Sequence, residues 1–120
     1  MRAPSRSDVR KLREYKTYRD FHSQLETTVH NQIHMFVGGT MALVEWSAYD
    51  PLFWVHHANV DRLWYLWQIG ANGVDPDATI LDQPLPLGKE AMTVRQTLDI
   101  SDLGYEYVSA AASVDGNRRD

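Results

Sequence analysis

The stretch of sequence that decides the fold spans residues 47–64 and reads SAYDPLFWVHHANVDRLW. Asp50 is a favourable N-cap residue, and Pro51 suits the first helical position because its missing N–H would have no partner there. Apolar side chains then lie on nearly every side of the expected helix, which Gly70 ends. A helix that is apolar all round is buried. We therefore predict a buried helix over residues 51–69.

Two further helical segments are predicted upstream of this stretch. Apolar residues recur with helical spacing over residues 8–26, which predicts a helix in one or two pieces, with Ser7 available as N-cap. A second, short helix is predicted over residues 29–36, and either Thr27 or Thr28 is a suitable N-cap for it. The chain is therefore expected to be mainly α.

The sequence after the long helix predicts less regular structure. Pro and Gly residues punctuate residues 70–92, which indicates an irregular segment that wraps around the helices instead of forming a core of its own. A short helix is expected over residues 93–98 and a short strand over 105–108. The last residues, 109–120, are small and polar, so we expect a flexible tail.

Composition excludes several classes of function. The chain has 120 residues, 43% hydrophobic and 23% charged, which is typical of a globular protein. Its net charge of −4 gives no attraction to nucleic acid or to an anionic membrane, and no run approaches the ~20 apolar residues of a membrane span. The absence of cysteine excludes disulfides, thiolate metal sites and cysteine nucleophiles. Nothing in the sequence indicates a cellular compartment.

Histidines are the side chains most able to carry chemistry here, and four of the five fall between His30 and His57. His30 and His34 are four residues apart, so on a helix both imidazoles leave the same face and can reach one metal ion at ~2 Å. A third histidine from the long helix, either His56 or His57, would complete a three-imidazole site. Spacing does not choose between these two. Ligation by nitrogen alone favours copper or zinc.

A simpler interpretation of the histidines has to be weighed. A pair with the spacing H-x-x-x-H is common and often has no metal. Asn31 stands where the metalloprotease motif requires glutamate, which excludes that class. A histidine on a buried helix favours a site, because a buried imidazole needs partners.

Residues 47–64 closely resemble the second copper-binding signature of the tyrosinases, a type-3 copper family that also contains catechol oxidases and molluscan haemocyanins. His30-Asn31-Gln32-Ile33-His34, followed by Val37-Gly38-Gly39, is similar to the upstream part of the same signature. Tyr105-Glu106-Tyr107 resembles the tyrosine motif that closes the catalytic domain of the family. The excess of Lys and Arg near the N-terminus predicts a basic arm or helix over residues 1–17. The resemblance implies a tyrosinase-like half-domain over 18–108. This half-domain would be the CuB helix pair of a di-copper four-helix bundle.

The resemblance assigns the CuB ligands to His30, His34 and His57. His56 is left out of this set and is expected to point away from the site. It also places Phe53, one turn before His57, as an aromatic platform beside the copper pair, and the shared helix face of these two residues supports this. Asp61, one turn after His57, would orient a ligating imidazole or its neighbours. The alternative for Asp61 is an ion pair with Arg62 or with the basic N-terminal segment.

By the same resemblance, Asn31 and Glu26 would position a water molecule that deprotonates an incoming monophenol. The alternative is that Asn31 only bonds backbone and that Glu26 is a solvated helix residue. Met35 is expected at the mouth of the pocket.

A complete site in this family binds a pair of copper ions, and the five histidines of this chain are too few to ligate both. The expected role is therefore the CuB half of an enzyme that oxidises phenols or catechols to quinones with O2. The CuA half is expected from missing sequence or from a partner chain. Alternatives are an oxygen carrier of haemocyanin type, a mononuclear three-histidine site with zinc or copper, and an inactive fragment.

Overall fold

The computed structural model describes residues 2–86 and 92–109 and is mainly helical, which confirms the predicted fold class. The chain divides into two compact units, Met1–Pro76 and Asp77–Asp120. Among the described residues, no helix combines the length and the apolar character needed to cross a bilayer. The first unit holds all the residues expected to form the metal site.

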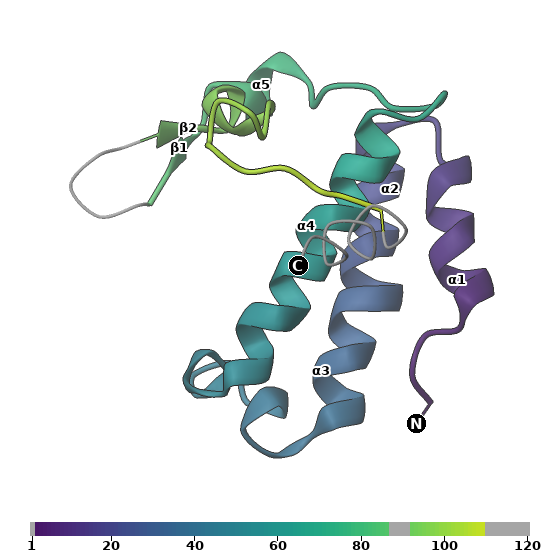
Figure 1. Ribbon diagram of the computed structural model, residues 1–120, viewed down its shortest axis with the longest axis vertical. Helices are drawn as coiled ribbons and strands as arrows, with labels where there is room; N and C mark the ends of the chain where they lie inside the picture. Colours follow the sequence, from purple (N-terminus) through teal and green to yellow (C-terminus); the bar gives the residue numbers. More distant parts are fainter. Residues whose placement is uncertain (1, 87–91, 110–120) are drawn as a thin grey trace, which may run out of the picture. The chain divides into compact units, whose positions relative to one another are not determined.

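The first unit consists of helices and helical turns. They are α1 (Arg6–Lys11), the 3-10 helix η1 (Leu12–Glu14), α2 (Tyr18–Gln24), the π-helix η2 (Leu25–His30), α3 (Asn31–Val37), the 3-10 turns η3 (Gly39–Ala42) and η4 (Ser47–Tyr49), and α4 (Pro51–Gln68). Helices α2 and α3 continue one another through η2 and run alongside α4 (Figure 1). This helix pair positions the histidines.

The N-terminal helix begins earlier than predicted. Ser5, not Ser7, is the N-cap of α1, because its hydroxyl accepts the N–H of Asp8 while the Asp8 carboxylate accepts the N–H of Ser5. This reciprocal pair is a capping box, and an acidic residue three positions after the cap is what favours it. The break after η1 confirms a division into two pieces, with Thr17 as the N-cap of α2.

The predicted start of a separate helix at Thr27 or Thr28 is wrong. The chain stays helical from Tyr18 to Val37, and η2 joins α2 to α3 without a cap. The Thr27 hydroxyl donates to the Ser23 carbonyl one turn earlier, so it bonds the existing helix instead of starting a new one. The turn becomes a π-helix, a rare form that is frequent at functional sites.

The long helix α4 begins as predicted and is buried differently from the prediction. Asp50 caps it by accepting the Leu52 N–H at 2.9 Å. The prediction that α4 is buried on every side is wrong, because Trp54 and Val55 are 64% and 68% exposed. Only one face of α4 meets α2 and η2 within this unit, and the buried side chains of α4 lie on that face. They are His56, Leu63 and Trp67.

The core of the first unit lies at the end of the helix pair away from α3. Phe21 and Trp67 stack with their rings 4.2 Å apart and nearly parallel, and both are 1% exposed. The indole N–H of Trp67 donates to the Tyr15 carbonyl at 2.8 Å. Leu12, Leu25, Val29 and Leu63 complete the cluster. This apolar packing holds η1, α2, η2 and α4 together.

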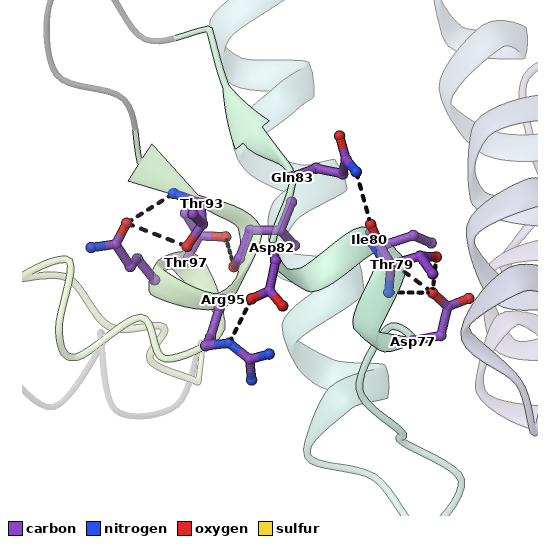
Figure 2. Close-up of polar contacts among 10 residues, drawn as sticks. Asp77, Thr79, Ile80, Asp82, Gln83, Thr93, Arg95 and Thr97 are labelled. Carbon is purple, nitrogen blue, oxygen red and sulfur yellow. Dashed lines mark hydrogen bonds and ion pairs between the residues drawn. The ribbon is translucent and has the colours of Figure 1, made fainter.

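The second unit is small. It contains α5 (Ala78–Leu81), the antiparallel strands β1 (Pro84–Leu85) and β2 (Met92–Thr93), and the 3-10 helix η5 (Val94–Thr97). Figure 2 shows its polar contacts: Asp77 caps α5, and Arg95 Nε lies 3.1 Å from Asp82 Oδ1. Helix η5 confirms the short helix predicted over 93–98.

Two predictions for the C-terminal part have different outcomes. The strand predicted over 105–108 is wrong, because these residues have no regular structure and the β1–β2 pair is formed without them. The Tyr105 N–H instead closes a turn on the Ile100 carbonyl at 3.3 Å. The predicted tail falls outside the described residues, apart from Ser109. The wrapping role of this part of the chain stays a prediction.

Candidate metal centre

The structure brings the three predicted ligands together. His30 ends the π-helix η2, His34 lies one turn later in α3, and His57 lies in the second turn of α4. Their ring centroids are 4.7 Å apart for His30 and His34, 5.0 Å for His30 and His57, and 5.4 Å for His34 and His57. All three side chains are partly exposed, so the cluster is open to a small molecule.

Hydrogen bonds fix the same ring nitrogen in all three histidines. In each ring Nδ1 lies at hydrogen-bond distance from a carbonyl-type oxygen, and such an oxygen can only accept. The pairs are His30 with Asn31 Oδ1 (2.8 Å), His34 with the Met41 carbonyl (2.7 Å) and His57 with the Phe53 carbonyl (2.7 Å). The proton of each neutral ring is therefore on Nδ1. Nε2 is left with a bare lone pair that can bind a metal.

One contact tests directly whether these residues fit a metal. Nε2 of His30 and Nε2 of His57 lie 3.1 Å apart. With both ring protons on Nδ1, two lone pairs face each other, and a cation between them would stabilise this arrangement. Two nitrogens bound at ~2.0 Å to one ion, at an angle of roughly 100°, are about 3.1 Å apart. The donor set and its spacing therefore fit a metal ion.

The prediction that His56 points away from the site is wrong. His56 is 8% exposed, and its ring packs near those of His30 and His34, with centroids 5.4 Å and 5.0 Å apart. A ligand nitrogen of His56 lies within 4.8 Å of those of His30 and His34. Its Nε2, however, lies 3.1 Å from the His30 carbonyl oxygen and must donate to it. His56 therefore differs from the other three in the nitrogen that carries the proton.

Burial favours the neutral form of both histidines on α4. The pKa of His56 is lowered to about 4, chiefly because burial disfavours the charged ring. Burial also lowers the pKa of His57, and repulsion from a protonated His30 or His34 acts in the same direction. Neutral imidazole is the form that binds metals, so these shifts agree with a site for a cation.

A pocket of about 540 Å³ opens beside the histidines. Its polar lining includes the ring edges of the three predicted ligands and Asn31. The ring centroids of Phe53 and His57 lie 3.9 Å apart, and Phe53 forms one wall of the pocket. Its role as an aromatic platform stays a prediction. The other apolar lining residues are Met35, Met41, Ala42, Val44 and Ala48. The pocket is large enough for a single aromatic ring.

Two predicted site residues lie outside this pocket. Glu26 is exposed on η2 and does not line it. Asp61 lines a second cavity of about 280 Å³, together with His57 and His22. The imidazole of His57 thus separates the two cavities, while the Phe53 carbonyl holds its Nδ1. A role for Asp61 in orienting the ligands stays a prediction.

Sequence reasoning missed the contribution of the segment between α3 and α4. Met41 is 1% exposed, and its carbonyl oxygen orients His34. Because a carbonyl is common to every residue, no side-chain pattern could indicate this partner. Gly38 offers a weak signal: its φ of 71° and ψ of −159° belong to a region that only glycine adopts readily, and it turns the chain back after α3.

Fold and site together define a class of helical proteins with a cluster of imidazoles between two helices. Comparison with known proteins then identifies the family. Residues 1–69 match the common central domain of tyrosinase. The chain therefore belongs to the tyrosinase family of type-3 copper proteins, which confirms the resemblance seen in the sequence.

Individual relatives are named either tyrosinase or hemocyanin. The chain is 48% identical over 60 residues to a tyrosinase from Neurospora crassa, covering 48% of this chain and 8% of that protein. It is 49% identical over 59 residues to a hemocyanin A-type from Enteroctopus dofleini (46% and 5%). It is 33% identical over 115 residues to hemocyanin 2 from Megathura crenulata (78% and 3%). The chain thus spans 8% or less of the length of these relatives.

Proposed function

We propose that this chain supplies the CuB half-site of a copper enzyme that oxidises phenols or catechols to quinones with O2. His30, His34 and His57 would hold the copper ion through Nε2. The observation that carries the proposal is the hydrogen bonding of all three Nδ1 atoms, which leaves three Nε2 atoms able to bind one cation. Copper bound there would supply the electron transfer between the phenol and O2.

The other residues of the pocket would bind and orient the phenol. Phe53 offers an aromatic side chain in the wall of the pocket, against which a ring can stack. Met35 and Met41 add an apolar lining that excludes water from the ring. These contacts favour a flat, mostly apolar substrate over a sugar or a phosphate ester.

Asn31 is proposed to hold the water that deprotonates a monophenol. Its Oδ1 accepts from His30, so its amide N–H groups are the part able to bind a water in the pocket. Glu26 would act on the same water from one turn earlier, although its carboxylate is exposed beside the pocket and not in it. A conservative Asn31→Asp variant tests the first role by its effect on monophenols relative to catechols.

Oxygen transport is the second candidate function, because relatives named hemocyanin match as well as those named tyrosinase. In both cases a second copper centre would come from other sequence or from a partner chain. A mononuclear three-histidine site fits the same imidazoles without a second centre. Catechol oxidation measured beside reversible O2 binding separates an enzyme from a carrier.

Copper stoichiometry is the first test of the half-site. We expect one copper per chain, bound much more weakly by His57→Ala. His22→Ala is the matched control, because His22 is exposed and stacks on Tyr18, with ring centroids 5.5 Å apart, outside the cluster. Two coppers per chain would contradict a half-site. Equal binding by the wild type and His57→Ala would contradict the assigned ligands.

A further inference from the structure

His56 is the one histidine of the cluster that the proposed ligand set does not use. It is buried at 8% exposure, next to His57 in sequence and across the helix pair from His30. Its ring is nearly parallel to that of His30, with centroids 5.4 Å apart and planes inclined by 13°. Burying an imidazole is unfavourable unless its polar atoms find partners, so its position calls for a role.

The hydrogen bond of His56 crosses between the two helices that carry the ligands. Nε2–H of His56 donates to the backbone carbonyl of His30 at 3.1 Å. His30 ends the π-helix, where the N–H of the next residue, Asn31, bonds the Glu26 carbonyl in place of the regular α-helical partner. The backbone that aims His30 is therefore not fixed by α-helical bonding alone.

We propose that His56 is a positioning residue of the copper half-site, which fixes the His30 ligand through its carbonyl and its ring face. This inference rests on the proposed function. Because His56 directly precedes His57, the same bond sets the spacing between the backbone of one ligand and the backbone of another. His56 does not bind the ion through Nε2, since that nitrogen carries the donated proton.

The test compares two substitutions, one of which can donate a hydrogen bond and one of which cannot. In His56→Gln the side-chain amide reaches about as far as Nε2 of histidine and can keep the bond to the His30 carbonyl. In His56→Leu the side chain fills the space without a donor. We expect the leucine variant to bind the same number of copper ions about 10–100-fold more weakly, and the glutamine variant to stay close to wild type.

Copper affinity is measured by competition with a chelator of known affinity, and the Cu(II) EPR spectrum reports the nitrogen ligands. Unchanged affinity in His56→Leu would overturn the positioning role. Equal weakening in both variants, with an altered nitrogen pattern, would show that His56 is itself a ligand. If His56→Leu does not fold, His56→Asn replaces it, because its shorter amide does not reach the carbonyl.

The outcome for the wild type separates this inference from the proposed function. A wild-type chain that binds no copper overturns the half-site itself. If the wild-type chain binds copper and both variants bind it with the wild-type affinity, only the role of His56 is overturned.

Discussion

At the scale of single residues, the choice of ring nitrogen decides what each histidine does. Three rings donate through Nδ1, two of them to main-chain carbonyls, and present Nε2 to the pocket. His56 instead donates through Nε2, and this nitrogen is therefore bonded to the His30 carbonyl on the neighbouring helical segment. Four chemically identical side chains thus have two distinct hydrogen-bonding patterns, and the oxygen atoms around each ring make the distinction.

The buried His56 predicts a pH dependence of stability for the metal-free chain. Its pKa is about 4 in the folded protein against 6.5 for an ordinary histidine, so the unfolded state takes up the proton first as pH falls. Stability should therefore be complete above pH 6.5 and fall between about 6.5 and 4, by on the order of 3 kcal/mol. Urea denaturation with a chelator present measures this.

The matched variants for that prediction are His56→Leu and His22→Leu. The first should flatten the pH dependence, leaving the smaller contribution of His57, whose pKa is also lowered. The second removes an exposed histidine outside the cluster and serves as the control. A slope that is the same in all three proteins would mean that other groups titrate in this range.

The sequence predicts which histidines lie close together better than it predicts how each ring is oriented. The pair His30 and His34 follows from helical spacing, and the structure brings it together with His57. Position alone did not reveal how His56 lies, because neighbouring helical side chains diverge by about 100° and both can still meet a partner helix. The carbonyl of Met41 had no signal at all, since its role depends on where the chain turns.

At the scale of secondary structure, capping chemistry is local and therefore readable. Asp50 and Pro51 predicted the start of α4 correctly because both act within one turn. The π-helix η2 was not predicted, since no residue pattern specifies where hydrogen bonds shift by one residue. The burial of α4 was predicted incorrectly for a different reason. An apolar sequence indicates that a helix can be buried on every side, but it does not say what packs against each side.

Removing the cap of α4 should destabilise the first unit. In Asp50→Ala the Leu52 N–H loses its acceptor, and the Thr40 hydroxyl loses the Asp50 carboxylate that it bonds at 3.1 Å. We expect a loss of about 1 kcal/mol in the free energy of unfolding, measured by urea denaturation. Asp75→Ala, which removes an exposed carboxylate from a loop, should change it by much less.

At the scale of the whole molecule, the apolar core and the histidines occupy opposite ends of one helix pair. Trp67 and Phe21 close one end, whereas exposed apolar side chains such as Trp54 and Val55 surround the other. We therefore expect a substitution in the core to change the stability of the fold with little effect on metal binding. Trp67→Ala should lower the free energy of unfolding by about 3–5 kcal/mol. Copper affinity, measured under conditions where the variant stays folded, should change far less.

The division into two compact units makes a second whole-molecule prediction. A chain that stops at Pro76 keeps the core and every residue of the proposed site. It should bind copper with the affinity of the full chain and show the same change in helical circular dichroism on unfolding, less the small contribution of α5. A large loss of copper affinity would show that the second unit acts on the site.

The π-helix has a consequence for how the chain tolerates changes in length. An α-helix cannot lose a residue without turning everything beyond it by about 100°. A π turn already accommodates one residue more than an α turn, so deletion of the exposed Thr27 would restore α geometry and leave Phe21 and His34 on their present faces. Deletion of Asn59 from α4, where there is no surplus residue, would rotate Trp67 away from the core. Copper binding and helical content should survive the first deletion and not the second.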